Sequence, residues 1–206
     1  MLSQTTKMPC KSISLSAKIC NTGSKLAKIP GTVCSECYAL RGFYNMPSVK
    51  KNMDARLLFM SGNNFVSDMI TYLREEEYFR WFDSGDIQNE IMGHRIIDVA
   101  EQTQWCEHWI PTKEYKWWRN ILLTRILPSN VCLRVSTPMD NTKPIPNWNQ
   151  TSTTFTSKNS PAYVGVECKA HLNKEYKCEE CRDCWDNTIT NIAYPKRSKK
   201  GKSNGK

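Results

Sequence analysis

The clearest β-strand in this sequence is Val131-Cys132-Leu133-Arg134-Val135. Its apolar and β-branched residues are typical of a strand buried in a sheet. The aromatic run from Tyr78 to Phe82 and the stretch from His108 to Ile110 have the same character, and Pro111 is expected to end the second of these. Three buried strands therefore form the framework of the predicted fold.

Helical patterns occupy the chain around these strands. Apolar residues at helical spacing predict helices over 49–60, 65–73, 87–100 and 115–126, with Ser48 and Thr112 as N-caps. Strands that alternate with helices indicate βαβ units and a largely parallel sheet. The Pro-, Asn- and Thr-rich stretch 136–160 reads as a long loop with one edge strand, and 185–191 as a short helix.

The length of 206 residues fits one domain, which we place at residues 1–195 as a single α/β metal-binding unit. Its cysteine-rich segments are 10–37 and 168–184. Residues 196–206 carry six Lys or Arg and no acid, which accounts for six of the nine net positive charges. We expect a disordered basic tail there, with at most weak phosphate contact to nucleic acid.

Ten cysteines are many for this length. The first twenty residues lack the apolar stretch of a signal peptide, and no apolar run approaches the ~20 residues that span a bilayer. We therefore expect a reducing compartment and no membrane association. Clustered cysteines in such a compartment usually bind metal rather than form disulfides.

The spacing of the cysteines indicates which of them bind. One run contains Cys178, Cys181 and Cys184, and one pair contains Cys34 and Cys37. Both spacings are typical of iron–sulfur and zinc ligands. Three thiols at i, i+3 and i+6 suit a [4Fe–4S] cluster better than a zinc ion, which remains the alternative. Isolated thiols form a second group of candidate ligands: Cys10, Cys20 and Cys168.

The other candidate positions have simpler interpretations. Cys106 and Cys132 lie inside the helix–strand pattern and read as ordinary buried thiols. The three histidines, His94, His108 and His171, are isolated and fit core or surface roles, although His171 lies beside the C-terminal cysteines. Trp185 directly follows the last of those cysteines and is expected to shield the metal from water.

Polar residues follow the predicted strands, and in a parallel sheet this is the edge where ligands bind. Asp83 and Asp86 follow the strand that ends at Phe82 and are the candidate catalytic residues, as acid and base or as substrate ligands. The alternative is that they cap the following helix, since Asp near a helix N-terminus stabilises it.

A set of short motifs, taken in their order along the chain, resembles a known protein family. It consists of residues 23–31, 34–39, 79–86, 108–112 and 178–185. Together these motifs resemble a family of bacteriophage proteins named after a mycobacteriophage product, gene product 88. The resemblance covers roughly residues 5–195 and implies a phage protein that works in the host cytoplasm.

The element from Cys34 to Ala39 is also similar to one in phage relatives of radical S-adenosylmethionine proteins. That similarity implies an incomplete parallel β/α barrel with a [4Fe–4S] cluster at its open face, across which the cysteine-rich C-terminal segment would fold. The usual C-x3-C-x2-C motif is not complete here, because Cys20 lies far upstream of Cys34 in the sequence.

The leading hypothesis is a phage-encoded iron–sulfur protein whose [4Fe–4S] cluster has a redox or a structural role. One alternative is a radical-S-adenosylmethionine-like or other cluster-dependent enzyme that uses Asp83 or Asp86. The other is a zinc-stabilised accessory protein that binds nucleic acid through the basic tail.

Overall fold

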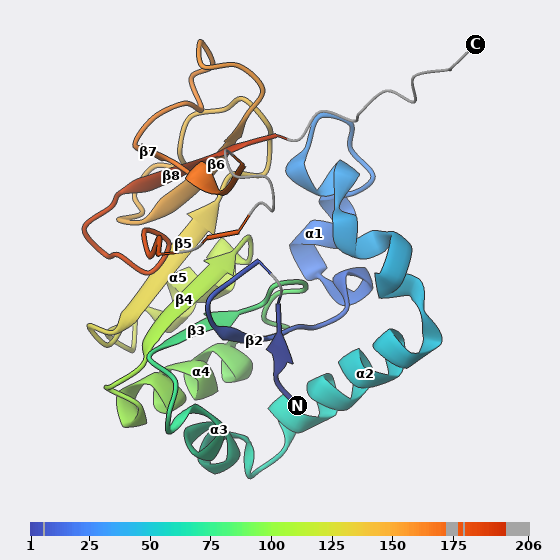
Figure 1. Ribbon diagram of the computed structural model, residues 1–206, viewed down its shortest axis with the longest axis vertical. Coiled ribbons are helices and arrows are strands. Elements are labelled where there is room, and N and C mark those ends of the chain that lie inside the picture. The colour runs from blue at the N-terminus through green and yellow to red at the C-terminus, as the bar shows by residue number, and fades with distance from the viewer. Residues whose placement is uncertain (6, 172–176, 179, 197–206) are drawn as a thin grey trace.

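The structure is a computed structural model that describes residues 1–5, 7–171, 177–178 and 180–196. Its centre is an open eight-stranded sheet with the order β1-β2-β3-β4-β5-β6-β8-β7 (Figure 1). Among the strand pairs of this sheet in the described residues, only β1–β2 is antiparallel. The strands are β1 (Ser3–Gln4), β2 (Lys11–Ile13), β3 (Tyr78–Trp81), β4 (Glu107–Thr112), β5 (Val131–Ser136), β6 (Thr151–Phe155), β7 (Val166–Glu167) and β8 (Asn191–Pro195).

A mixed α/β fold with a mostly parallel sheet is therefore confirmed. Six strands, β2, β3, β4, β5, β6 and β8, pair in chain order and run parallel. The sheet does not close, because β1 and β7 remain at its two edges.

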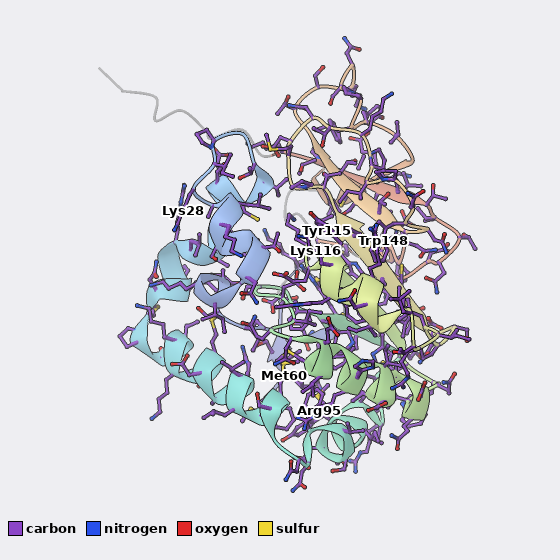
Figure 2. The ribbon with its side chains drawn as sticks, turned by 180° about the vertical axis from the view of Figure 1, so that it is seen from behind. Lys28, Met60, Arg95, Tyr115, Lys116 and Trp148 are labelled. Carbon is purple, nitrogen blue, oxygen red and sulfur yellow. The ribbon has the colours of Figure 1, made fainter. Side chains whose placement is uncertain are left out.

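The four longer helices pack against one face of this sheet. In the described residues the α-helices are α1 (Asn21–Leu26), α2 (Pro47–Ser61), α3 (Phe65–Leu73), α4 (Glu90–Gln102) and α5 (Tyr115–Ile121). Figure 2 shows α4 and α5 in front of the sheet when it is seen from behind. The Arg95 guanidinium on α4 donates to the carbonyl oxygens of Met60 and Gly62, which ties α4 to the end of α2. None of these helices is long and apolar enough to cross a membrane.

The alternation of side chains along each strand separates two environments. Phe79 and Trp81 of β3 point into the main core with the helices, and Tyr78 and Arg80 point to the opposite face. On β5, Leu133 belongs to the helical side, so its neighbours Cys132 and Arg134 face the other way. That second face is covered by the cysteine-rich C-terminal segment, and the site is built there.

Several predicted boundaries need correction. The helix α2 begins at Pro47 with Met46 as its N-cap, not Ser48, because proline at the first helical position has a suitable fixed φ. The helix expected from residue 87 begins at Glu90, and Asn89 caps it by accepting a hydrogen bond from the Met92 amide.

The region around β4 and α5 also differs from the prediction. Pro111 does not end the strand, which continues to Thr112 in register with β5. The following helix has Glu114 rather than Thr112 as its N-cap and ends at Ile121. Ile126, assigned to the apolar face of that helix, is 89% exposed.

The polar stretch after β5 contains an interior strand rather than an edge strand. β6 lies between β5 and β8 and is buried at Thr151 and Thr153. The hydroxyl of Thr151 donates to the Asn191 side chain, and the hydroxyl of Thr153 donates to the carbonyl of Ala162. The helix predicted for 185–191 is wrong, since that segment forms turns that lead into β8.

Candidate metal centre

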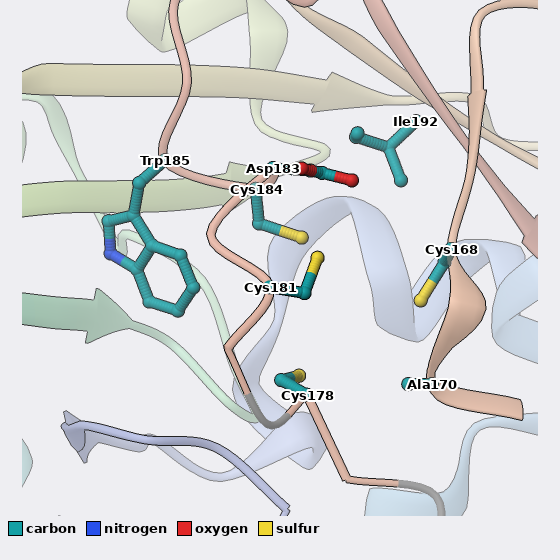
Figure 3. A pocket seen from close by; sticks show the side chains of 8 residues that line it. All are labelled: Cys168, Ala170, Cys178, Cys181, Asp183, Cys184, Trp185 and Ile192. Atoms are coloured by element: carbon teal, nitrogen blue, oxygen red, sulfur yellow. The ribbon is translucent and has the colours of Figure 1, made fainter. Parts of the chain in front are cut away.

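Four cysteines line one small pocket near the C-terminus: Cys168, Cys178, Cys181 and Cys184. Cys168 directly follows β7, and the other three lie on the loop before β8. Figure 3 shows the Cys168 side chain pointing into the pocket from one wall, with Cys181 and Cys184 opposite. The Cys181 amide donates to the Cys178 carbonyl at 2.8 Å, which is the tight turn that C-x2-C spacing predicts.

The loop that carries these thiols is held by Arg134, which is fully buried. Its guanidinium donates to the carbonyl oxygens of Cys184 (3.0 Å), Asp183 (2.9 Å), Asp186 (2.7 Å), Ile189 (2.8 Å) and Thr151 (3.5 Å). Five rigid donors on one side chain can fix a loop that has no regular secondary structure. Sequence reasoning missed this role, because Arg134 occupies a strand position and its partners lie far along the chain.

Trp185 covers one side of the pocket. It is 4% exposed and lines the pocket beside Cys184. Its indole N–H donates to the Phe79 carbonyl at 3.0 Å. Its ring packs edge-on against the rings of Trp109 and Tyr78, with centroid distances of 5.2 Å and 5.6 Å. These contacts anchor the cysteine loop to β3 and β4, where Trp185 can exclude water.

Cys10 also belongs to this part of the molecule. In sequence it lies closer to the N-terminal cysteines, yet it packs in a small core cluster with Met8, Trp109 and Trp185, next to Cys178 and Cys184. Burial raises the pKa of Cys10 to about 12. It is therefore a neighbour of the C-terminal thiols, but it does not line their pocket.

Burial in the pocket disfavours ionised thiols, whereas nearby arginine side chains favour them. Burial raises the pKa of Cys184 to about 12, and hydrogen bonding to Tyr194 and the charges of Arg134 and Arg80 act in the opposite direction. Burial also raises the pKa values of Cys168, Cys178 and Cys181. Without a bound cation the thiols stay protonated at neutral pH, whereas metal ligation requires thiolates.

A second group of thiols lies beyond the carboxyl end of β2. Cys20 precedes α1, Cys34 lies in the 3-10 helix η2 (Val33–Glu36), and Cys37 ends that helix. Gly23 of α1 packs between two of them: a Cβ added to Gly23 would lie 3.5 Å from the Cys20 sulfur and 3.7 Å from the Cys34 sulfur. The structure therefore brings together Cys20 and Cys34, which the sequence separates.

Burial is the largest influence on the pKa values of two thiols of this group, Cys20 and Cys34. It raises the pKa values of Cys20 and Cys34, and the charges of Asp86 and of the neighbouring thiols raise them further. For Cys34 the Lys113 charge acts in the opposite direction. Asp86 and Glu114 thus lie near the N-terminal group, whereas Arg134 and Arg80 lie near the C-terminal group, whose pocket is also lined by Asp183.

A carboxylate ties this second group to the sheet. Glu114, just after β4, is buried and accepts hydrogen bonds from the Thr22 amide (2.7 Å) and hydroxyl (2.8 Å). Thr22 lies two residues after Cys20, so this double hydrogen bond positions the start of α1.

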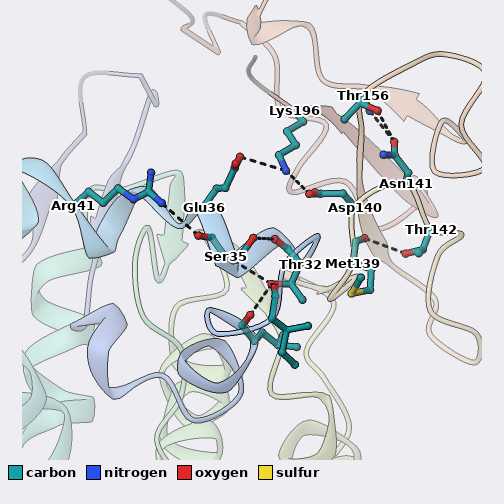
Figure 4. A network of polar contacts seen from close by, with 12 residues as sticks. Thr32, Ser35, Glu36, Arg41, Met139, Asp140, Asn141, Thr142, Thr156 and Lys196 are labelled. Atoms are coloured by element: carbon teal, nitrogen blue, oxygen red, sulfur yellow. Dashed lines mark hydrogen bonds and ion pairs between the residues drawn. The ribbon is translucent and has the colours of Figure 1, made fainter. Parts of the chain in front are cut away.

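The other side of this N-terminal loop is tied to the end of β5 and to β8 (Figure 4). The Val33 amide donates to the Pro138 carbonyl at 2.9 Å. Lys196, just after β8, forms ion pairs with Glu36 (3.3 Å) and Asp140 (2.5 Å). Its ammonium group therefore joins the Cys34–Cys37 turn to the segment that follows β5. The rest of the predicted basic tail, 197–206, lies outside the described residues.

The candidate acids Asp83 and Asp86 lie at the carboxyl end of β3, as expected, but neither caps α4. Asp86 is buried and accepts hydrogen bonds from the Ile87 amide, the Thr112 hydroxyl and the Lys113 amide. Burial raises its pKa to about 7. Asp86 therefore links the segment that follows β3 to the end of β4.

Asp83 is less enclosed. Its carboxylate accepts hydrogen bonds from the hydroxyls of Ser12 and Tyr44, both at 3.3 Å, and the Tyr38 hydroxyl donates to its backbone carbonyl. The turn that separates Asp83 from Asp86 requires glycine, because Gly85 has φ +82° and a Cβ there would lie 2.6 Å from the Leu15 Cβ.

The residues assigned to ordinary roles do not line the C-terminal thiol pocket. Cys106 is buried in the main core, and Cys132 is buried with a weak contact to the Asp186 carbonyl. His108 is buried between Trp81 and Thr103, and burial lowers its pKa to about 3, so it is neutral. The side chain of His171 lies outside the described part of the structure.

Within the described residues, no three or more His, Cys, Asp or Glu side chains are arranged to hold a single metal ion. A tetrahedral zinc ion with Zn–S bonds of about 2.3 Å needs sulfur atoms only about 3.8 Å apart. A cluster divides its thiolate ligands among several irons, so its sulfur ligands are spread more widely.

A comparison with protein families gives one match. The family model for gene product 88 matches residues 1–187. The chain belongs to the gene product 88 family. The match contains both thiol groups, and it supports the phage-family resemblance that the motifs suggest. No curated protein and no solved structure matches significantly.

Proposed function

We propose that the protein binds an iron–sulfur cluster through Cys168, Cys178, Cys181 and Cys184. The observation that carries this proposal is that four thiols from two separate segments line one pocket. Four cysteines are the usual ligand set of a [4Fe–4S] cluster. Such a cluster would supply a one-electron redox centre or a cross-link between β7 and the loop before β8.

The surroundings of the pocket support a metal-bound anion rather than free thiols. Two guanidinium groups, those of Arg134 and Arg80, act on the Cys184 sulfur, and neither has an ion pair within the described residues. A buried positive charge is costly unless a negative one is near. Four thiolates around a cluster would add negative charge to that of Asp83, which interacts with Arg80, and of Asp186, which interacts with Arg134.

The test is iron and acid-labile sulfide analysis of protein that has been purified without oxygen. The wild type should be brown and contain iron and sulfide, whereas Cys181→Ser should lose the metal of this pocket. The matched control is Cys106→Ser, which changes a buried thiol in the main core and should keep the wild-type iron content. A colourless wild-type protein that contains only zinc would contradict the proposal.

A second candidate function is a cluster-dependent enzyme at the N-terminal group, Cys20, Cys34 and Cys37. It is favoured by the packing of two of these sulfurs around Gly23 at the ligand-binding edge of a parallel sheet. Three protein thiols would leave one coordination position for a substrate such as S-adenosylmethionine. Asp83 is the better candidate acid or base there, since Asp86 already accepts three hydrogen bonds.

Electron paramagnetic resonance of the reduced protein tests this candidate. S-adenosylmethionine should change the spectrum of the wild type and of Cys181→Ser, but not that of Cys34→Ser. An unchanged wild-type spectrum would count against the enzyme and leave the C-terminal site unaffected.

The third reading, a zinc-stabilised protein that binds nucleic acid, depends on the basic tail 196–206, of which residues 197–206 lie outside the described part of the chain. Salt-dependent DNA affinity that disappears when these residues are deleted would support it.

A further inference from the structure

One thiol of the C-terminal pocket lies within hydrogen-bonding distance of a tyrosine hydroxyl. The Cys184 sulfur lies 3.1 Å from the Tyr194 hydroxyl. A thiolate has no proton, so once Cys184 is a metal ligand only the hydroxyl can donate. Tyr194 lies on β8, in register with Thr154 of β6, so the interior of the sheet fixes its backbone.

The backbone of the same cysteine is held by a positive charge. Arg134 donates its Nε–H to the Cys184 carbonyl at 3.0 Å and uses its other donors on the same loop. It is fully buried, and within the described residues its hydrogen bonds go to carbonyl oxygens and to no carboxylate. Its charge acts on the Cys184 sulfur and also on the carboxylate of Asp186, with which it forms no ion pair.

A second guanidinium lies nearby, on β3. Arg80 stacks over the Trp109 ring, with its central carbon 4.5 Å from the ring centroid, and Trp109 packs on Trp185. Its Nη1 donates to the Met8 sulfur at 3.0 Å, and its buried Nε has no partner in the described part of the chain. A neutral sulfur is a weak acceptor, and the charge of Arg80 acts on Asp83 as well as on Tyr194 and Cys184 at the thiol pocket.

We propose that Tyr194 and Arg80, acting through Cys184, raise the reduction potential of the cluster in this pocket, so that the site is redox-active. The inference rests on the proposed function. Hydrogen bonds to ligand sulfurs and nearby positive charge stabilise the more negative, reduced state of an iron–sulfur cluster.

The experiment is a potentiometric titration of the anaerobic protein, in which dithionite supplies one electron to each cluster. Tyr194→Phe removes only the hydroxyl and should shift the midpoint potential to a more negative value with unchanged iron content. Arg80→Met should shift it in the same direction, and Arg80→Lys should restore most of the difference. The matched control is Tyr163→Phe. The Tyr163 hydroxyl donates to Glu167, so its removal should leave the midpoint potential unaltered.

A direct readout of the hydrogen bond accompanies the titration. Resonance Raman bands of the Fe–S(Cys) stretch should shift in D₂O for the wild type, and part of that shift should be lost in Tyr194→Phe. Midpoint potentials equal to the wild type in both Tyr194→Phe and Arg80→Met would overturn the inference, and so would loss of the cluster in Tyr194→Phe. Absence of iron from the wild type would instead overturn the proposed function itself.

Discussion

The two thiol groups are built in different ways on the same sheet. The N-terminal group, Cys20, Cys34 and Cys37, lies beyond the carboxyl ends of the strands, and carboxylates surround it. The C-terminal group, Cys168, Cys178, Cys181 and Cys184, lies on the sheet face opposite the helices, and Arg134 and Arg80 flank it. Positive charge favours a site that must keep four thiolates, and an open strand end favours a site that must admit a ligand.

The comparison shows that the two groups differ in their charged neighbours. Arg134 and Arg80 lie near the four C-terminal thiols, together with Asp183, whereas Asp86 and Glu114 lie near the three N-terminal thiols. If the two groups are independent sites, changes at one should leave the other unaffected.

The largest expected effect is loss of one site at a time. Cys184→Ser should remove the metal of the C-terminal group, and Cys34→Ser that of the N-terminal group, each taking about half the iron if both groups hold one cluster. The measurement is iron per chain together with the visible spectrum. If either variant abolished the whole signal, the two groups would be ligands of one site, and the comparison would fail.

Arg134→Met should strongly destabilise the C-terminal group. Five carbonyl oxygens lose their donor, and at about 1 kcal/mol for each buried acceptor the free energy of unfolding should fall by about 5 kcal/mol. Guanidinium chloride unfolding measures this change. The control is Arg125→Met, since Arg125 makes only surface ion pairs with Asp98 and Glu101, which are worth about 0–1 kcal/mol. Equal effects of the two substitutions would show that Arg134 does not hold the loop.

The N-terminal group should respond to pH through Asp86. Its pKa is about 7 in the folded state because of burial, against about 3.9 in an unfolded chain. Between these values the folded state binds the extra proton, so the contribution of Asp86 to stability falls as pH rises, by up to about 4 kcal/mol in all.

The free energy of unfolding of the wild type, relative to that of Asp86→Asn, should therefore decrease from pH 5 to pH 7.5. Denaturant titrations at steps of pH give this difference. Parallel curves for the two proteins would mean that Asp86 does not titrate in this window.

A smaller effect is expected for Glu114→Gln. The amide keeps one acceptor for the Thr22 amide or hydroxyl and loses the other, at a cost of about 1–2 kcal/mol. Metal affinity should weaken at the N-terminal group alone, because Thr22 positions the segment that begins at Cys20. The measurement is chelator competition, with the C-terminal spectrum as the internal reference. A loss confined to the C-terminal group would contradict the assignment.

Much of the sheet could be predicted, because the strands 78–81, 107–112 and 131–136 are marked by buried apolar residues. β6 could not be recognised as an interior strand, because its buried residues include Thr151 and Thr153, whose hydroxyls are satisfied only by distant partners. The polar composition of this segment is therefore typical of a loop.

The candidate site divides in the same way. The spacing of Cys178, Cys181 and Cys184 identified one wall of the pocket, since those three residues are local in sequence. The proximity of Cys20 to Cys34 depends on the path of α1, and the role of Arg134 depends on carbonyls about fifty residues away. Neither leaves a local pattern that sequence reasoning could use.

The most direct test of the central claim isolates the C-terminal group. A variant with Cys20, Cys34 and Cys37 all replaced by Ser should be purified without oxygen and analysed for iron, sulfide and zinc. The account predicts about four irons and four sulfides per chain, with the visible absorption of a [4Fe–4S] cluster. A variant that contains zinc alone, or no metal, while the wild type contains iron would contradict it.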